Sequence, residues 1–203
     1  MKTMRVNRQT VAAHRAAILD QAERLFRGQG IEGVGVADIT RAAGLTHGAF
    51  YSHFPSKTAL AAEACRHSLL QGAEHWRARA ARARARGADP LSAIIDAYLS
   101  ERHRDEPQDG CALATLGPEI VRAEAPLRAA LDEGLTTLTN VLDEEIAALR
   151  PLLDPSARSR AALAIVAAMT GGLIVARALA GNPERSRAAL SAAAAMARAV
   201  ADA

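Results

Sequence analysis

The sequence predicts an all-α protein in which a small N-terminal helix-turn-helix unit precedes a larger helical domain. Half of the residues are hydrophobic and only 3% are aromatic, and alanine dominates the hydrophobic share. Alanine has the highest helix propensity of all residues, and little of the chain favours strands. Apolar residues recur at helical spacing between breaks made by proline, glycine and aspartate. We therefore expect two helical domains, over residues 1–55 and 56–203.

The first predicted helix runs from about residue 10 to residue 29, where Gly28 and Gly30 mark its end. Its apolar face carries Ile18, Ala22, Leu25 and Phe26. The segment before it, residues 1–9, has almost no apolar side chains and holds Lys2, Arg5 and Arg8. Two compatible interpretations of this basic segment stay open, a solvated terminus or an arm that contacts DNA phosphates or a minor groove.

The stretch over residues 35–57 is predicted to form two short helices joined by a tight turn. Residues 36–43 form the first helix, and Gly44 can adopt the left-handed conformation that ends it. Thr46 can cap a second helix, over about 47–53, through its hydroxyl. Two short helices around a glycine turn form a helix-turn-helix, whose second helix enters the major groove of DNA.

Large side chains are expected to hold this small unit together, because a helix of about seven residues is not stable alone. Four of the six aromatic residues of the chain lie within the first 57 residues. Phe26, Phe50 and Phe54 are predicted core residues. Tyr51 follows Phe50 directly and is therefore expected to point away from the core.

A long helix is predicted next, from residue 57 to about residue 86. Pro55 disfavours a helical residue before it, and Ser56 is a natural N-cap. This helix joins the first unit to everything downstream, so we expect it to carry any signal between the two domains. Its end holds five arginines alternating mainly with alanine, which favours a solvated helix end over a nucleic-acid patch.

The remaining helices are separated by clear breaks. Asp89 and Pro90 supply a cap and a first helical residue, and Gly117-Pro118 should kink the helix that contains it. The uncharged run Ala161–Ala176 is shorter than the ~20 apolar residues that span a bilayer, so we expect a core helix and no membrane association. The predicted helices cover residues 90–104, 111–123, 126–149, 156–180 and 184–202.

The positive charge of the chain is concentrated in its first part. Net charge is +3 overall, with +4 in residues 1–57 and −1 in the remainder. This distribution suits a polyanionic partner for the helix-turn-helix. The two cysteines, Cys65 and Cys111, do not make a disulfide framework, and we expect a cytoplasmic protein with free thiols.

The helix-turn-helix stretch resembles the TetR family of bacterial transcriptional regulators. The matching residues are Asp38-Ile39, Ala42-Ala43-Gly44-Leu45, Gly48, Phe50-Tyr51, His53-Phe54 and Pro55-Ser56-Lys57, with Ala16 to Leu19, Ala22, Leu25-Phe26 and Gly30 before them. The resemblance covers about the first third of the chain. It implies an operator-binding homodimer whose larger domain holds a small-molecule effector. Gly35 and His47 depart from the family pattern, which affects the expected phosphate contacts more than the fold.

The residues predicted to contact DNA lie on and just after the second helix of the motif. Those expected nearest the groove are Thr46, His47, Gly48 and Ala49. Those expected to hold phosphates are Tyr51, His53 and Lys57. The second helix has no arginine, asparagine or glutamine, so bidentate recognition of bases from it is unavailable, and contacts of Ala49 with thymine methyls together with DNA shape should matter more.

The last two helices resemble the dimer interface of the family, a four-helix bundle formed by both subunits. The predicted interface residues are Leu163, Val166, Ala167, Thr170, Gly171, Ile174, Leu190, Ala194 and Ala197. Such apolar stripes are equally compatible with burial inside one chain. The helix-turn-helix favours the dimer, because such domains commonly bind palindromic sites as two-fold dimers.

An effector pocket is implied by the resemblance, inside the larger domain. Its candidate polar or aromatic residues are Trp76, Tyr98, His103, Cys111, Thr115 and Arg177. We expect alanine, leucine and valine to supply the rest of the lining, which would suit an apolar organic ligand. Cys111 begins a predicted helix after a polar loop, so it is also a candidate sensor of oxidants or electrophiles; its alternative is a structural thiol.

Two functional classes stay open. The first is a ligand-responsive repressor, and the second is a helical interaction protein with a structural DNA-binding unit, as in chromosome organisation or cell division. The large second domain, with near-neutral charge, favours the first class. Enzymatic activity is not expected, because the sequence has no nucleophile elbow, phosphate-binding loop or zinc-binding H-E-x-x-H motif. We expect no cofactor and no metal site.

Overall fold

The computed structural model describes residues 8–203, and every regular element in this range is a helix. Lys2 and Arg5 of the predicted basic arm lie outside the described residues, and Arg8 begins the first helix. The elements are α1 (Arg8–Gln29), α2 (Val36–Ala42), α3 (His47–Phe50), α4 (Lys57–Arg84), α5 (Pro90–Tyr98), α6 (Glu101–Asp105), the 3-10 helix η1 (Pro107–Asp109), α7 (Ala112–Ile120), α8 (Ala125–Leu149), α9 (Pro155–Ala178) and α10 (Pro183–Asp202). The predicted all-α fold class is confirmed.

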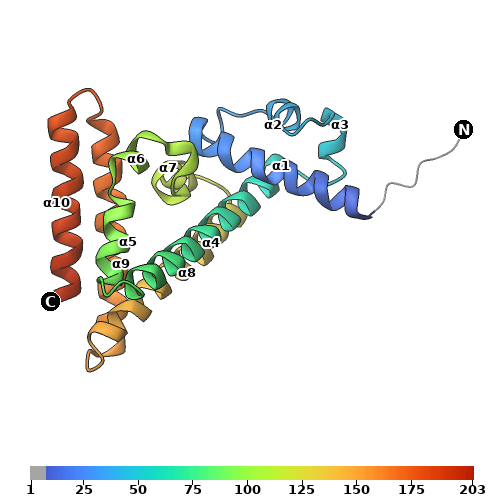
Figure 1. Cartoon of the computed structure of the whole chain (residues 1–203). Coiled ribbons are helices and arrows are strands. Elements are labelled where there is room, and N and C mark those ends of the chain that lie inside the picture. Colours follow the sequence, from blue (N-terminus) through green and yellow to red (C-terminus); the bar gives the residue numbers. More distant parts are fainter. Residues whose placement is uncertain (1–7) are drawn as a thin grey trace, which may run out of the picture.

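The N-terminal unit consists of α1, α2 and α3, which lie together at one end of the molecule (Figure 1). Of its predicted core and apolar-face residues, Leu25 is half-buried and the others are buried, namely Ile18, Ala22, Phe26, Phe50 and Phe54. Tyr51 is 60% exposed, as its position beside Phe50 predicted. Phe50 of α3 and Phe54 after it therefore complete the core that packs against α1, while the Tyr51 ring lies on the surface.

Helix α4 leaves this unit and runs beside α8 along the body of the molecule (Figure 1). The predicted Ser56 cap is confirmed, because its Oγ accepts a hydrogen bond from the Ala59 N–H at 3.0 Å. Ion pairs Arg66–Glu133 and Arg84–Glu145 follow the same order along both helices, so the two helices run in the same direction. The two 25–28-residue helices form the long scaffold between the ends of the molecule.

The helix predicted over residues 90–104 is broken in the structure into α5 and α6. Asp89 and Pro90 cap its start as predicted, with Asp89 accepting from two backbone N–H groups. Ser100 breaks it, since its Oγ donates to the Ala97 carbonyl at 2.9 Å and accepts from the His103 N–H at 3.2 Å. A serine side chain that bonds to nearby backbone competes with the continuing helix. The break brings His103 to the wall of an internal cavity.

Helices α9 and α10 form an antiparallel pair at the other end of the molecule (Figure 1). A Cβ on Gly172 would collide with the Cβ of Ala193, so these helices approach as closely as only glycine permits. Among the described residues, α9 is the one helix long and apolar enough to span a membrane by length and composition. Core helices of soluble proteins share these two properties, and α9 packs against α8 and α10.

Candidate DNA-binding surface and ligand cavity

The predicted helix-turn-helix is present, with a shorter second helix than expected. Gly44 has a φ of +70°, the left-handed conformation predicted for it. Helix α3 spans only four residues, and the chain continues as a turn through His53. Thr46 occupies the N-cap position, but its hydroxyl makes no capping hydrogen bond, so that detail of the prediction is wrong. At α2, the Asp38 carboxylate accepts from the Gly35 N–H at 3.2 Å, in place of a side-chain cap from residue 35.

The residues predicted to contact DNA lie together on one outer side of this unit. Those that are exposed are Thr46, His47, Gly48 and Tyr51, and those that are half-buried are Ala49, His53 and Lys57. A Cβ on Gly48 would have no heavy atom within 4 Å, so the α3 backbone has open space in front of it. The rings of His47 and Tyr51 meet edge to face at 5.7 Å between centroids. Four of the seven predicted contacts are therefore accessible and three are partly accessible, and their roles stay predictions.

His53 has an environment that disfavours its protonated form. Partial burial lowers its pKa, and the neighbouring positive charges of His14 and Arg15 lower it further. The His14 and His53 rings lie 6.2 Å apart, and the Arg15 guanidinium sits 4.7 Å above the centre of the Phe54 ring. A neutral His53 still offers one ring N–H to a phosphate oxygen, but it adds no charge.

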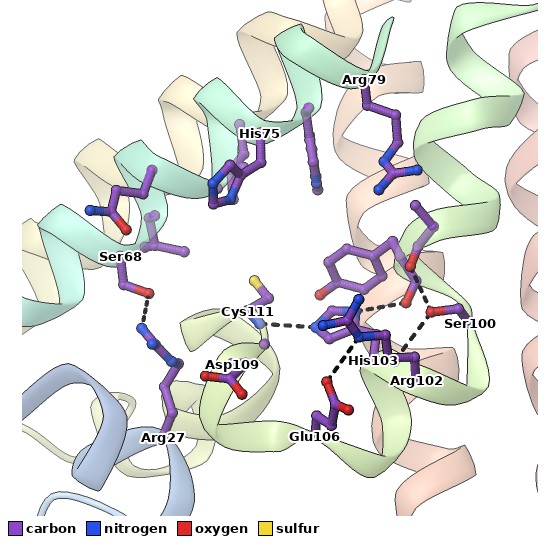
Figure 2. Close-up of a pocket in the computed structure, with 18 residues that line it drawn as sticks. Arg27, Ser68, His75, Arg79, Ser100, Arg102, His103, Glu106, Asp109 and Cys111 are labelled. Carbon is purple, nitrogen blue, oxygen red and sulfur yellow. Dashed lines mark hydrogen bonds and ion pairs between the residues drawn. The ribbon is translucent and has the colours of Figure 1, made fainter. Parts of the chain in front are cut away.

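A cavity of about 780 Å³ lies in the larger domain, and among the described residues Arg27 is the one lining residue from the N-terminal unit. Four of the six predicted pocket residues line it, namely Trp76, Tyr98, His103 and Cys111 (Figure 2). Two predicted residues are not in the lining. Thr115 bonds back to the Cys111 and Ala112 carbonyls inside α7. Arg177 is directed to the carbonyls of His103 and Arg104, behind the cavity wall.

The lining is more polar than the sequence led us to expect. Its apolar part consists mainly of Leu69, Trp76, Ala97, Tyr98 and Leu138. Charged and polar side chains fill the rest, namely Arg27, Ser68, Gln71, His75, Arg79, Ser100, Arg102, His103, Glu106 and Asp109. The expectation of a lining made mostly of alanine, leucine and valine is therefore wrong. Alanines dominate the helix-packing faces, while longer polar side chains reach the space between helices.

The neutral ring of His103 links the backbone of Tyr98 to the backbone of Cys111 at the cavity wall. Its Nδ1 lies 2.7 Å from the Tyr98 carbonyl, and its Nε2 accepts a hydrogen bond from the Cys111 N–H at 2.9 Å. Burial lowers the pKa of His103, and the nearby Arg177 charge lowers it further against an opposing effect of the Tyr98 carbonyl. A neutral imidazole with its proton on Nδ1 satisfies both bonds. Protonation would remove the acceptor that the Cys111 N–H uses.

The Tyr98 ring connects this part of the wall to the long helix α4. It packs edge to face on Trp76, at 5.9 Å between centroids, and on His103, at 4.6 Å. Its hydroxyl lies 3.4 Å from the Thr170 hydroxyl of α9, and burial raises its pKa. Three rings from α4, α5 and α6 therefore form one continuous wall.

The structure also reveals a cavity residue that sequence analysis missed, Arg27 of α1. Its Nε donates to the Gln108 carbonyl at 2.8 Å, and its Nη1 donates to Ser68 Oγ at 2.7 Å (Figure 2). Nη1 also pairs with the buried Glu23 carboxylate at 3.3 Å. Nothing local distinguishes Arg27 from a solvated arginine in the last turn of a helix. Its role depends on η1, which lies 80 residues further along the chain and packs on α1.

The predicted dimer stripe divides into two sets. Four of its residues are covered by helices of the same chain, namely Val166, Leu190, Ala194 and Ala197, with 0–8% of their surface exposed. These side chains are covered within the single chain, and their place in a dimer interface stays a prediction. Leu163, Ala167, Gly171 and Ile174 lie on the exposed side of α9, and Thr170 is half-buried between the two faces.

Comparisons with known proteins agree with this architecture. Residues 18–64 match the model of the bacterial regulatory proteins of the tetR family. The chain is 31% identical over 173 residues to the HTH-type transcriptional regulator LmrA of Bacillus subtilis (strain 168), covering 83% of this chain and 88% of LmrA. Over 59 residues it is 42% identical to the HTH-type regulator AcrR of Shigella flexneri, which is 29% of this chain and 27% of AcrR.

Solved structures share the fold at lower sequence identity. The reduced form of E. coli NemR has a TM-score of 0.75 at 20% identity, covering 92% of this chain and 97% of NemR. A regulator from Cytophaga hutchinsonii has a TM-score of 0.72 at 20% identity, covering 98% of both chains. With a relative above 30% identity along most of both chains, and a helix-turn-helix at the matched residues, this chain belongs to the TetR family of non-enzymatic, DNA-binding transcriptional regulators.

Proposed function

We propose that this protein is a cytoplasmic, ligand-responsive repressor that binds a palindromic operator as a homodimer and releases it when a small molecule fills the cavity. The observation that carries the proposal is the position of Arg27. This residue belongs to α1 of the DNA-binding unit, and it also lines the cavity of the larger domain. A ligand in the cavity would therefore touch the DNA-binding unit directly. A purely structural interaction protein would have no need of such a shared wall.

Contacts between α1 and the segment from η1 to α7 supply a route from the cavity to the DNA. Arg27 holds the Gln108 carbonyl of η1, and the Glu119 carboxylate of α7 accepts from the Ile31 N–H at 2.8 Å. Both contacts join the end of α1 to the segment that carries Cys111, whose N–H donates to His103 of α6. A ligand that shifts this segment would tilt α1 together with the helix-turn-helix packed on it. This route adds to the one along α4 that the sequence predicted.

The test of this coupling uses Arg27→Lys, which keeps the charge and loses the fork of donors. We would select operator sequences from a random DNA pool and screen a metabolite library by thermal shift. A ligand found in this way should release operator DNA from the wild type and release the variant poorly, with both proteins binding DNA equally without ligand. Equal release of DNA from both proteins would show that Arg27 does not couple ligand binding to DNA release.

Lys57 tests the DNA-binding surface. It is the first residue of α4, where free backbone N–H groups already favour a phosphate. Lys57→Ala should weaken binding to all DNA sequences about equally and lower the slope of log affinity against log salt by about one. Arg82→Ala is the matched control, an exposed arginine near the other end of the same helix. An unchanged salt slope in Lys57→Ala would contradict the phosphate contact.

An exposed apolar face on α9 and α10 supports the homodimer. Four of the large hydrophobic side chains exposed on the chain lie there, namely Leu163, Ile174, Val175 and Met196. Between them, α9 presents Ala167 and Gly171, so another helix could approach closely. Exposed apolar side chains on two neighbouring helices are suited to a second copy of the chain, as a palindromic operator would require.

Gly171→Arg tests the dimer without disturbing the single chain. A Cβ at Gly171 meets no atom within 4 Å, so the chain itself has room for the side chain. An unpaired charge at a closely packed interface is strongly unfavourable. The variant should sediment as a monomer and lose operator binding. Gly181→Arg, at another unobstructed glycine beyond α9, is the control and should remain dimeric. If the Gly171→Arg variant remained a dimer, the interface would not include this part of α9.

A second candidate function is covalent sensing at Cys111, and the position of its thiol favours it. Cys111 lines the cavity, and its sulfur points into the open space (Figure 2). The acidic residues that precede Cys111 in the chain are paired with arginines, Asp105 with Arg104, Glu106 with Arg102 and Asp109 with Arg24. Cys65 differs, because it is 1% exposed and burial raises its pKa to about 12.

Maleimide modification tests the sensor in the Cys65→Ala protein. The thiol adds across the maleimide double bond, and the rate should follow the thiolate population as pH is varied. DNA affinity would be measured before and after modification, with Cys111→Ser as the unreactive control. Rapid modification that releases DNA would support the sensor. Modification without any change in DNA affinity would leave Cys111 as a structural residue.

A further inference from the structure

The charges around the cavity do not balance, and the excess is positive. Its acidic neighbours are already bound to arginines, with Glu106 2.9 Å from Arg102 and Asp109 3.7 Å from Arg24. The buried Glu23 carboxylate next to the cavity is bound to Arg27 and His67. Every carboxylate at the cavity wall therefore has a cationic partner before any ligand enters.

Arg79 is the lining arginine that has no ion-pair partner among the described residues. Within residues 8–203, Arg27 and Arg102 make ion pairs, but Arg79 makes none. Its side chain extends from α4 toward α5 and lines the cavity (Figure 2). It lies one turn after Trp76 on the same face of α4, so a group bound by the guanidinium would sit beside the ring wall.

A second uncompensated cation lies behind the same wall. Arg177 donates a hydrogen bond from Nη2 to the His103 carbonyl at 2.7 Å and from Nε to the Arg104 carbonyl at 3.2 Å. Its Nη1 is buried and has no hydrogen-bond partner among the described residues. The nearby carboxylates of Glu101 and Asp105 do not neutralise it, because both are bound to Arg104. Burial lowers the pKa of Arg177, as expected for a cation without a counter-ion.

The neutral part of the lining defines the rest of the ligand. Trp76 and Tyr98 offer ring faces and edges, and Leu69 and Leu138 continue the apolar surface from α4 and α8. Pockets of this size usually bind a mostly apolar body oriented by a few polar groups. Beside the apolar surface, Gln71 and Ser100 are uncharged and Arg79 is a cation without an ion pair to any described residue. A cationic ligand would meet Arg79 with no free carboxylate to receive it, whereas an anionic ligand would give its exposed guanidinium a charged partner in place of water.

We propose that the effector is an amphiphilic organic anion, whose carboxylate lies at Arg79 and whose apolar body packs on Trp76 and Tyr98. This inference rests on the proposed function of the cavity as an effector site. The Arg79 guanidinium is exposed to solvent, and a charge-assisted hydrogen bond from it to a carboxylate is stronger than one to a neutral oxygen. Arg177 adds a second positive charge behind His103.

The experiment compares probes that differ only in their head group. Isothermal titration would be carried out with decanoate, decanol and decylamine, and with phenylbutyrate, phenylbutanol and phenylbutylamine. In at least one series the carboxylate should bind about tenfold more tightly than the alcohol, which corresponds to about 1.4 kcal/mol, and the amine should bind least. Arg79→Gln should bring the carboxylate to the affinity of the alcohol.

Arg82→Gln is the matched control, since it removes the same charge from the same exposed helix end outside the cavity lining. It should keep the full preference for the carboxylate. Arg177→Gln should reduce the preference by a smaller factor, with unfolding followed by circular dichroism to exclude a folding defect. The proposal is overturned if no carboxylate binds, if alcohol or amine binds as tightly, or if Arg79→Gln and Arg82→Gln behave alike.

Operator binding by the ligand-free protein separates this outcome from failure of the proposed function. A protein that binds operator DNA but shows no carboxylate preference would remain a regulator with a different ligand class. A protein that prefers the carboxylate but binds no specific DNA sequence would retain the anion site and lose the proposed role as a repressor. Release of operator DNA by the preferred carboxylate, lost in Arg79→Gln, would support both together.

Discussion

His103 makes the stability of this protein sensitive to pH, and His103→Gln should remove that sensitivity. In the native chain the neutral ring donates from Nδ1 to Tyr98 and accepts the Cys111 N–H at Nε2. A glutamine can supply one donor and one acceptor in the same place, and it does not titrate. The difference between the two proteins therefore isolates the protonation of one side chain.

The direction of the effect follows from the lowered pKa of His103. Burial lowers this pKa below its ordinary 6.5, so the unfolded chain takes up the proton first as the pH falls. The stabilising effect of the neutral ring is fully present above pH 6.5 and is lost as the pH falls below it. If the native ring stays neutral, lowering the pH from about 6.5 to about 5.5 costs about 1 kcal/mol through this residue alone.

The assay is thermal unfolding of both proteins at fixed concentration, followed by circular dichroism across this pH range. For a chain of this length, about 1 kcal/mol corresponds to about 2–4 °C in Tm. The wild type should lose this amount relative to His103→Gln, after subtraction of the pH dependence that both share. Parallel curves for the two proteins would refute the assignment of a neutral, doubly bonded ring, and a wild type that gains stability in acid would reverse its sign.

Three further outcomes follow from the packing. Gly172→Ala should lower stability by about 1–3 kcal/mol in denaturant unfolding, because its Cβ would overlap the Cβ of Ala193 and force α9 and α10 apart; an unchanged midpoint would contradict that close approach. Cys65, buried and with its pKa raised to about 12, should resist alkylation in the native protein and react in denaturant, as peptide mass spectrometry would show. Glu119→Gln should speed hydrogen exchange of the Ile31 amide, whose N–H loses a charged acceptor at 2.8 Å; unchanged exchange would mean that this contact does not restrain the end of α1.

Local backbone chemistry made most of the helix boundaries predictable. Gly44 takes the left-handed conformation that only glycine adopts readily, and Ser56 and Asp89 accept the free N–H groups at helix starts. These interactions act within about four residues, so they depend on sequence neighbours alone. The aromatic residues Phe50 and Phe54 were predictable core for a similar reason, since a unit this small has few large side chains to bury.

The break at Ser100 was not predictable from local sequence, because the Ser100 side chain competes with the helix for backbone hydrogen bonds. No proline or glycine interrupts residues 91–106, and serine is acceptable in a helix interior when its side chain faces solvent. Only the packing of α5 and α6 on their neighbours selects the bonds from Ser100 to Ala97 and His103 that break the helix. A weak local preference became decisive because the tertiary structure placed His103 against Tyr98.

By itself, the sequence determined the all-helical class, the helix-turn-helix and the residues on its outer surface, because periodicity and turn chemistry specify them locally. The tertiary structure decided the composition of the cavity and the division of the α9 face. Arg27 lines the cavity because it donates a hydrogen bond to the carbonyl of Gln108, which is distant in the sequence. Arg177 does not line the cavity, because it donates hydrogen bonds to carbonyls of α6. Val166 is buried while Leu163 is exposed, although both lie on one apolar helix. A helical pattern shows that a face is apolar, but only the arrangement of the neighbouring helices determines what covers that face.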